Sequence, residues 1–347
     1  MSTFERVADL PLRVESYELE RLEQPISPEF TRVTTQVRLR GGGEEGIGED
    51  VTYDAAEHDR LAEQRHALEG EWTLASFSQH LGGLEFFPEP PDMEAFRDYR
   101  RWGFESAALD LALRQAGRSL ADVLDREPRP VRFVVSLRLG EPSSLEPIRA
   151  LLANYPATRF KLDPVPDWSQ ELVEDLAALG SVDVVDLKGQ YSGTVVDNPA
   201  DAALYRLVAE GFPDAWIEDP ALTDETDPVL RPHRDRITWD APIHSVDDID
   251  GLPFPPRTLN IKPSRFGSIE RLFATYDYCE ERGMGMYGGG QFELGVGRGQ
   301  IQYLASLFHA ESSNDIAPGG YNLAPSEPGL PTSPLAPAAD SVGFRSG

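Results

Sequence analysis

The sequence predicts an α/β protein in which a modified (β/α)8 barrel of the TIM type follows a smaller α+β domain. Three observations support this fold class. Short apolar runs in the middle and later parts of the chain each end on a charged residue, often just before a proline. Segments with helical spacing separate these runs. The first part of the chain instead has strand-like segments followed by helix-like ones, which is typical of an α+β unit.

The clearest apolar run is Trp216-Ile217-Glu218-Asp219-Pro220. Trp and Ile favour a buried strand, whereas Pro220 cannot continue a sheet ladder, so the strand should end at Glu218 or Asp219. The same pattern occurs at Arg159 to Leu162, Val182 to Asp186, Arg236 to Trp239 and Thr258 to Ile261. The spacing between consecutive strand-end charges is 22 to 32 residues. One strand-plus-helix unit of a (β/α)8 barrel takes about 30 residues, so the spacing fits this repeat.

The strand-end charges should meet at one face of the barrel. Helix-like segments at 169–179, 199–210 and 268–282 separate the strands, so the repeat is βα and the strands are parallel. Parallel strands place their C-terminal ends on one face of a barrel. The residues predicted to converge there are Lys161, Asp186, Glu218, Asp240 and Lys262.

Three carboxylates at one place need a counter-charge. Two carboxylates about 4 Å apart repel by roughly 4 kcal/mol at an effective dielectric of 20, so three pairs repel by about 12 kcal/mol. The net stability of a domain is about that size. Either the acids do not cluster, or a hard dication lies between them, and Mg2+ with oxygen ligands suits Asp186, Glu218 and Asp240. We favour the second interpretation; the alternative is that each acid is a helix N-cap or a solvated loop residue.

These residues resemble the enolase superfamily, specifically its muconate-lactonizing-enzyme subgroup, which includes muconate cycloisomerase and o-succinylbenzoate synthase. The resemblance spans most of the chain. Its most specific segments are Ile217-Glu218-Asp219-Pro220 and Leu259 to Gly267, and Glu293 to Gly297 is a weaker match. The resemblance implies that the smaller N-terminal domain caps the barrel mouth and supplies specificity from its loops. It also implies a homo-oligomer.

The resemblance further implies a reaction. Asp186, Glu218 and Asp240 would bind Mg2+, Lys161 and Lys262 would act as acid and base on opposite faces of the substrate, and the proton alpha to a carboxylate would be removed to give an enediolate. The outcome would be racemisation, epimerisation or cycloisomerisation, and the alternative is dehydration of the o-succinylbenzoate synthase type. Arg159, Lys188 and Glu293 would support the site or bind substrate. A base role needs the lysine pKa lowered by about three units, or about 4 kcal/mol, from about 10.4; otherwise the lysines only pair with the acids.

The chain also departs from the family pattern. Arg159 stands where the first lysine of Lys-x-Lys is usual, and Asp240-Ala241 replaces the usual Asp-Glu pair. Residues 283–291 contain no histidine, which disfavours the mandelate-racemase subgroup, and Asn314-Asp315 is not the Asp-x-Asp of dipeptide epimerases. The alternative that is not an enzyme is therefore a catalytically silent barrel that binds metal as a structural or binding module.

The N-terminal domain should begin with an antiparallel meander. Segments 14–22 and 32–40 alternate with period two, a glycine-rich turn follows at 41–43, and Gln24 to Phe30 carries two prolines and should be a surface loop. Helical spacing then appears at 54–68, 93–101 and 104–116. The prolines at 128–130 mark a border before a first barrel strand at 131–139. The predicted domains are 1–127, 128–323 and a Pro/Ala-rich segment 324–347, which is either disordered or a strap that returns to the N-terminal domain.

Composition limits the partners. The chain has 59 acidic and 32 basic residues in 347, a formal charge of −27. Such a surface repels phosphate backbones and anionic lipids, so we expect neither nucleic acid nor membrane, but a small-molecule carboxylate as substrate. Cys279 is the only cysteine, and no stretch has the roughly 18 apolar residues of a membrane helix. We therefore expect a cytoplasmic protein.

Overall fold

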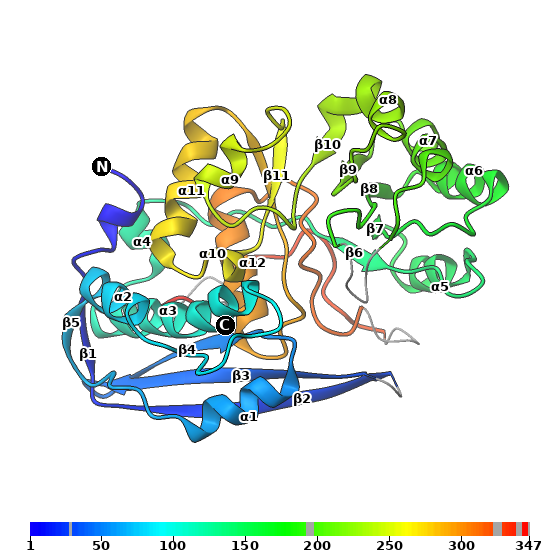
Figure 1. Cartoon of the computed structure of the whole chain (residues 1–347). Coiled ribbons are helices and arrows are strands. Elements are labelled where there is room, and N and C mark those ends of the chain that lie inside the picture. Colours follow the sequence, from blue (N-terminus) through cyan, green and yellow to red (C-terminus); the bar gives the residue numbers. More distant parts are fainter. Residues whose placement is uncertain (28–29, 192–197, 322–327, 338–341, 346–347) are drawn as a thin grey trace.

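The computed structural model describes residues 1–27, 30–191, 198–321, 328–337 and 342–345. A barrel formed by the later two thirds of the chain lies on a smaller unit of strands and helices formed by the N-terminal third (Figure 1). The predicted fold class is confirmed. None of the helices in the described part is both long and apolar enough to cross a membrane. The exact domain borders stay a prediction.

The N-terminal unit is built on the antiparallel meander β2 (Ser16–Ser27), β3 (Phe30–Gly41) and β4 (Glu44–Asp50). The predicted loop 24–30 is wrong in its extent, because β2 runs to Ser27 and β3 begins at Phe30, while residues 28 and 29 lie outside the described ranges. The physical reason is that β2 is the edge strand of this sheet. Pro25 can take part in an edge strand because no further strand needs its missing N–H.

The helix α3 (Ala95–Gln115) packs against β4 at very short distance. The sequence predicts two helices here, but Trp102 and Gly103 continue one helix through the expected gap. A Cβ atom on Gly48 would lie 2.1 Å from the carbonyl oxygen of Gly103, so only glycine fits at this crossing. The backbones of β4 and α3 therefore touch. This contact holds the end of β4, with Glu49 and Asp50, in a fixed place.

The remaining elements of the N-terminal unit surround this core. The pair β1 and β5 is antiparallel, and α2 is a helix that the sequence reading missed. Its capping box, in which Thr73 and Ser76 bond each other's backbone N–H, is the signal that marks its start. The bounds are η1 (Phe4–Arg6), β1 (Pro11–Val14), α1 (Ala55–Glu63), β5 (Gly70–Thr73), α2 (Leu74–Gly82) and α4 (Leu120–Leu124).

The barrel has eight parallel strand positions. Five neighbouring strands are β6 (Val134–Leu137), β7 (Arg159–Leu162), β8 (Val182–Asp186), β9 (Trp216–Glu218) and β10 (Ile237–Thr238), and a parallel pair is formed by β11 (Thr258–Ile261) and β12 (Gly285–Gly288). The N–H of Asn260 donates to the carbonyl of Trp239 at 3.0 Å and joins β11 to β10. Asp315 pairs with Gly289, and Asn314 pairs with Phe133, so residues 314–315 occupy the eighth position and close the ring.

Helices follow the strands along the chain, as a βα repeat requires. The bounds are α5 (Glu146–Asn154), α6 (Gln170–Leu179), α7 (Ala202–Gly211), α8 (Asp227–Leu230), η2 (Arg231–Arg236), α9 (Val246–Asp250), α10 (Pro263–Phe266), α11 (Ile269–Glu281) and α12 (Val296–Phe308). The strand expected at 131–139 is shorter than predicted, since β6 covers four of those residues.

Two buried side chains hold the eighth strand position. The Oδ1 atom of Asn314 accepts the N–H of Gly288 at 2.6 Å and lies 2.7 Å from Nδ1 of His309. The Nδ2 group of Asn314 donates to the carbonyls of Arg132 and His309. Because Oδ1 of Asn314 can only accept, the proton on His309 belongs to Nδ1. His309 and Asn314 thus replace the continuous ladder of a regular strand.

The buried His309 predicts a pH-dependent stability. Burial lowers the pKa of His309 to about 4, whereas an unfolded histidine has a pKa of about 6.5. Between these two values the unfolded chain binds a proton that the folded chain does not, so stability from this group is present above about pH 6.5 and is lost as the pH falls toward 4. The loss amounts to about 3 kcal/mol. Urea unfolding of wild type and His309→Gln at pH 7 and pH 4 checks this: their difference in unfolding free energy should shrink by that amount, and parallel pH profiles would contradict it.

The C-terminal segment returns to the N-terminal unit. Leu335 forms an antiparallel bridge with Val131 at the start of the barrel. Phe344 is fully buried and contacts Trp102 edge-to-face, with ring centroids 6.4 Å apart. Its N–H donates to Asp110 of α3 at 2.8 Å. The described residues of this segment therefore connect the barrel with α3.

Candidate active site

Five charged residues predicted from the sequence lie together at the C-terminal ends of the barrel strands. Lys161 lies on β7, Asp186 and Glu218 are the last residues of β8 and β9, Asp240 lies just beyond β10, and Lys262 directly follows β11. Asp186 and Glu218 are in register across the parallel pair. The three acids are fully buried, and the two lysines are 1% and 7% exposed. The convergence follows from the strand ends alone.

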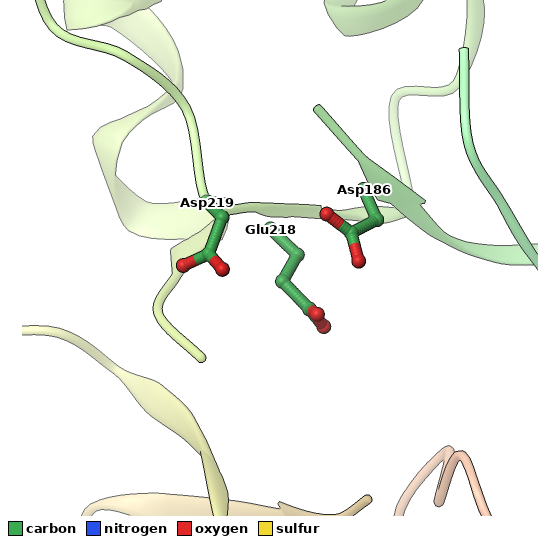
Figure 2. A group of neighbouring side chains, drawn as sticks. All are labelled: Asp186, Glu218 and Asp219. Carbon is green, nitrogen blue, oxygen red and sulfur yellow. The ribbon is translucent and has the colours of Figure 1, made fainter. Parts of the chain in front are cut away.

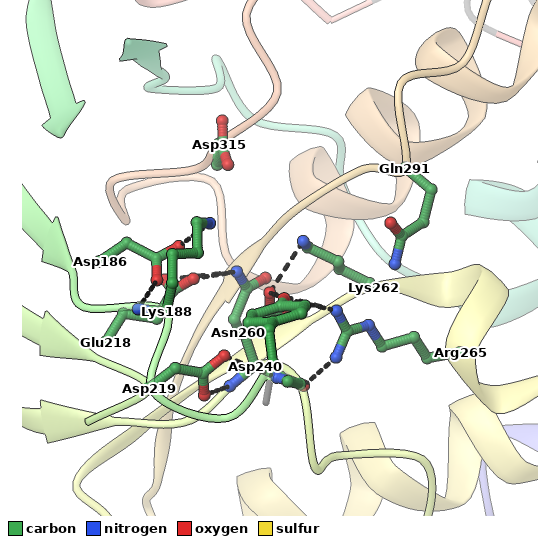
Figure 3. A network of polar contacts seen from close by, with 12 residues as sticks. Asp186, Lys188, Glu218, Asp219, Asp240, Asn260, Lys262, Arg265, Gln291 and Asp315 are labelled. Atoms are coloured by element: carbon green, nitrogen blue, oxygen red, sulfur yellow. Dashed lines mark hydrogen bonds and ion pairs between the residues drawn. The ribbon is translucent and has the colours of Figure 1, made fainter. Parts of the chain in front are cut away.

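The two lysines contact the acids from opposite sides. The Nζ atom of Lys161 pairs with Glu218 and lies 2.9 Å from Oδ2 of Asp186. The Nζ atom of Lys262 lies 2.8 Å from Oδ2 of Asp240. Lys161 and Lys262 belong to the second and sixth of the eight strand positions, which face each other in a closed ring. In Figure 3, Asp186 lies on one side of the network and Lys262 on the other.

Asp219 is a fourth buried acid at the same place. Oxygen atoms of Asp186, Glu218 and Asp219 lie within 4.8 Å of one another, so this group could hold a metal ion (Figure 2). Asp219 has a φ of +49°, an uncommon conformation for a non-glycine residue. Its two carboxylate oxygens accept the N–H groups of Asp240 and Ala241, at 2.8 and 2.9 Å. Asp219 thereby holds the backbone that carries Asp240.

The two carboxylate oxygens of Asp240 differ: one contacts several neighbouring side chains and the other has no hydrogen bond in the described part of the chain. Its Oδ2 atom accepts the hydroxyl of Tyr191 at 3.1 Å and lies 3.4 Å from Nη2 of Arg265, besides the contact with Lys262. Its Oδ1 atom is buried and has no hydrogen-bond partner within the described part of the chain. A buried carboxylate oxygen without a partner is costly, so this atom is suited to bind a cation.

The acids shift each other's pKa. Burial raises the pKa of Glu218 well above its usual range; Lys161 opposes this shift, and Asp186 and Asp240 add to it. Burial, with the charges of Asp240 and Asp186, raises the pKa of Asp219 to about 7. Burial alone would also raise the pKa of Asp186, but Lys161 and Lys188 hold it below its usual range. The cluster is therefore short of positive charge.

The formal charges of the cluster suit a divalent cation. Its acidic members outnumber its cationic members by two when the exposed Arg138, 3.4 Å from Asp163, is left out; the count covers Asp163, Asp186, Glu218, Asp219, Asp240 and Asp315 against Lys161, Lys188, Lys262 and Arg265. One divalent cation would balance this excess. The donors are all carboxylates, which are the ligands that Mg2+ and Ca2+ prefer.

The three supporting residues predicted from the sequence lie in different places. Lys188 belongs to the cluster, where its Nζ atom pairs with Asp186. Arg159 is the first residue of β7, at the far end of that strand, and its Nε atom donates to Asp183 at 2.8 Å. Glu293 lies in the segment between β12 and α12, where it accepts the N–H of Gln291 and lies 3.2 Å from Arg298. Among the contacts of the described residues, Arg159 and Glu293 have none with the acids of the cluster.

Several buried polar residues of the site were missed by the sequence reading. Asn260 and Tyr287 approach Glu218 from β11 and β12: the amide of Asn260 lies 3.5 Å from it, and the hydroxyl of Tyr287 donates to it. Asn260 lies two residues before Lys262, and side chains two apart share a face of a strand. That parity is the signal that could have found it. Asp315, 3.5 Å from Lys161, was expected with Asn314 at the end of the eighth strand, and this strand-end position is the signal that could have assigned it to the site.

The N-terminal unit reaches the edge of the site. The hydroxyl of Tyr53 donates to Oε1 of Gln291 at 3.3 Å, and Nε2 of Gln291 donates to the hydroxyl of Tyr99 at 3.0 Å. Figure 3 shows Gln291 on the side of Lys262. Glu49 of β4 accepts the N–H groups at the start of α12. Residues of the N-terminal unit thus hold the segment that follows β12 in place.

Comparisons with known proteins agree with this arrangement. Sequence-family models described as the C-terminal and N-terminal domains of Domain of unknown function (DUF8230) match residues 127–323 and 5–123. The N-succinylamino acid racemase of Thermus thermophilus is 26% identical over 328 residues, which cover 88% of this chain and 86% of the relative. The o-succinylbenzoate synthase of Bacillus subtilis is 28% identical over 224 residues, which cover 62% and 58%.

Solved structures share the fold. The crystal structure of a dipeptide epimerase from Methylococcus capsulatus complexed with Mg ion superposes with a TM-score of 0.69 at 20% sequence identity, covering 90% of this chain and 92% of that one. Muconate cycloisomerases have the same fold. The resemblance to the enolase superfamily is confirmed: the relatives are named racemase and o-succinylbenzoate synthase, and solved members of that superfamily share the fold of this chain. Since the C-terminal family model alone matches more than half of its length, the chain belongs to the DUF8230 family.

Proposed function

We propose that this chain removes the proton alpha to a carboxylate of a small-molecule substrate, with Mg2+ held by Asp186, Glu218 and Asp240. The observation that carries the proposal is the pair of buried lysines, Lys161 and Lys262, on opposite sides of these acids. Two ammonium groups that only neutralised the acids would not need facing positions in the ring. A base on each side of a substrate carbon does need them.

The ligand assignment rests on the donor atoms. The carboxylates of Asp186 and Glu218 lie beside each other at the ends of β8 and β9 (Figure 2). Asp240 has a buried Oδ1 atom without a hydrogen bond in the described part of the chain. Asp219 accepts the backbone N–H of Asp240 and so helps to hold Asp240 in place. Asp219 is the alternative to Asp240 as the third metal ligand. When bound, Mg2+ supplies positive charge that favours the negative charge developing on the substrate carboxylate.

The lysines would exchange roles between the two directions of reaction. A neutral lysine takes the alpha proton from its face, and the protonated lysine opposite returns a proton to the other face, which inverts the configuration. Burial lowers the pKa of Lys161, whereas Asp186 and Glu218 outweigh it and raise that pKa well above its usual range. Balancing the charge of these acids would remove much of the upward shift, so that Lys161 could act as a base near neutral pH.

The outcome that we favour is racemisation or epimerisation, and N-acyl amino acids are the first substrate class to test, because a relative is named N-succinylamino acid racemase. Cycloisomerisation would use the same proton transfer. Dehydration of the o-succinylbenzoate synthase type is the alternative, supported by the relatives of that name. The formal charge of −27 supports a small molecule rather than nucleic acid or a membrane surface as partner.

Proton exchange in D2O tests the proposal. Pools of N-acyl amino acids, dipeptides, acid sugars and cyclic lactones are incubated with the enzyme and Mg2+ and followed by proton NMR. We expect loss of the alpha-proton signal in one class, and its retention when a chelator is present. Exchange that continues in chelator would contradict the role of Mg2+. Absence of exchange from every pool would favour the catalytically silent metal-binding barrel.

A further inference from the structure

Lys188 occupies an unusual backbone conformation directly after β8. Its φ is +54°, in the left-handed region that non-glycine residues seldom adopt. Its N–H donates to Oδ1 of Asp186 at 3.2 Å, and the N–H of Gly189 donates to the carbonyl of Asp219 at 2.8 Å. The first bond closes a tight turn just beyond the strand, and the second fixes this turn to the segment that follows β9. The turn brings the side chain of Lys188 to the carboxylate two residues before it.

The ammonium group of Lys188 is held by three neighbours. It forms an ion pair with Oδ2 of Asp186, lies 3.6 Å from Oδ1 of Asp163, and stands 5.5 Å from the ring centre of Tyr191. The side chain is 16% exposed. Figure 3 shows Lys188 beside Asp186, on the side of the network away from Lys262. Lys188 is therefore a fixed part of the acid cluster.

Asp186 carries two ammonium groups on one oxygen. The Nζ atom of Lys161 lies 2.9 Å from the same Oδ2 atom that Lys188 contacts. A cation bound at Asp186 would be repelled by both groups, and repulsion between charges a few ångströms apart in a buried site is weakly screened. Lys161 is needed for proton transfer in the proposed reaction. Lys188 has no such role in the proposed reaction, so its charge can be removed without removing a proton donor or acceptor.

We propose that Lys188 is a built-in competitor of the divalent cation, which neutralises Asp186 when the cation is absent and lowers the affinity of the site for it. The inference rests on the proposed function only in taking Asp186 as a metal ligand. Of the two roles expected for Lys188, binding substrate or supporting the site, it takes the second. Lys188 thus influences the cation through its ion pair with Asp186, without taking part in the reaction itself.

Asp163 sets how strongly Lys188 competes. Its Oδ1 atom has no hydrogen bond in the described part of the chain, and Lys188 is its neighbour at 3.6 Å. Its Oδ2 atom lies 3.4 Å from Nε of Arg138, an exposed side chain. Asp163 therefore draws the ammonium group away from Asp186. Without the charge of Asp163, Lys188 would rest on Asp186 alone and would oppose the cation more strongly.

Calorimetric titration of the full chain with Mg2+, at one pH and ionic strength and without substrate, tests the inference. Lys188→Met keeps the length of the side chain but removes the charge, and should lower the Kd by at least about tenfold, or about 1.4 kcal/mol. Asp163→Asn should raise the Kd severalfold. Most of the effect of Asp163 passes through Lys188, so the double variant should bind Mg2+ more tightly than Asp163→Asn and nearly as tightly as Lys188→Met. Arg159→Met, which removes the same charge at the other end of β7, should change the Kd less than about twofold.

A purely structural role of Lys188 predicts the opposite sign. If Lys188→Met damaged the site, the variant would bind Mg2+ more weakly than wild type. If the substitution removes a competitor, the variant binds Mg2+ more tightly. Lys188→Arg, which keeps the charge, should have the Kd of wild type. The melting temperature adds a second readout: without metal it should fall in Lys188→Met, and the increase on adding Mg2+ should be larger than in wild type. An unchanged or raised Kd in Lys188→Met overturns the inference alone. Failure of both wild type and Lys188→Met to bind Mg2+ overturns it together with the proposed metal site.

Discussion

Replacing either site lysine by methionine is expected to lower the rate of racemisation by at least about a thousandfold, or about 4 kcal/mol. Each lysine serves one face of the substrate carbon, and inversion needs both. Exchange in D2O should behave differently from racemisation. Lys161→Met should still exchange the enantiomer whose proton faces Lys262, and Lys262→Met should exchange the other one. Proton NMR of the two separate enantiomers, with chiral analysis of the product, measures both quantities.

The pattern of exchange also decides between the outcomes left open. If wild type exchanges only one enantiomer, and only one of the two lysine variants abolishes that exchange, the enzyme uses a single base, as a dehydration would require, and the two-base proposal is wrong. Arg159→Met is the matched control, because Arg159 lies two residues from Lys161 on the same strand but pairs with Asp183 at the other end. Its rates should equal those of wild type. Binding of Mg2+ to the lysine variants, measured by calorimetry, shows that the site is intact.

The main site residues could be predicted because their signal is local. An apolar run that ends in a charge before a proline marks a strand end, and parallel strands bring such ends together without any further information. Glu218, Asp240 and Lys262 were found in this way. Asp219 was not placed in the cluster, because its burial depends on a φ of +49° that nothing in the sequence indicates. For Lys188 the residue was identified, but the positive φ that turns it onto Asp186 was not foreseeable.

The limits on the fold have similar causes. The parallel barrel and the antiparallel meander follow from periodicity, which a single sequence displays. The extent of β2 was misread because Pro25 argues against a strand unless the strand is known to be an edge. The two helices expected at 93–101 and 104–116 merge into α3, since Gly103 lies inside the helix, where its lack of a side chain allows the close approach to β4. Both errors concern tertiary neighbours, which local patterns do not encode.

The contact of Glu49 with the start of α12 is a tertiary link of this kind, and it joins the two units of the molecule. Glu49 lies in β4 and is 1% exposed. It accepts the N–H groups of Leu294, Gly295 and Gly297, at 2.7, 3.0 and 2.8 Å. The helix lacks a cap of its own, because Gly295 at its N-cap has no side chain. A carboxylate at a helix N-terminus satisfies unpaired N–H groups and suits the helix dipole, so the N-terminal unit supplies the missing cap.

Glu49→Ala is therefore expected to lower the free energy of unfolding by about 4 kcal/mol, since one buried and two partly buried N–H groups would lose their acceptor at about 1–3 kcal/mol each. Glu49→Gln keeps one acceptor and should lose about half as much. Urea unfolding measures both variants. Hydrogen exchange should locate the effect, with faster exchange at Leu294, Gly295 and Gly297 in Glu49→Ala.

Glu49→Ala also tests whether the contact of Glu49 with the start of α12 positions the segment after β12 for catalysis. Gln291 lies in that segment, next to Tyr53 and Tyr99 of the N-terminal unit and on the side of Lys262. Loosening the start of α12 should therefore lower kcat/KM for proton exchange, while the Kd for Mg2+ stays the same, because Asp186, Glu218 and Asp240 belong to other strands. Equal losses of Mg2+ affinity and exchange would mean that Glu49 supports the whole barrel. A loss of stability below about 1 kcal/mol would contradict its role as the cap of α12.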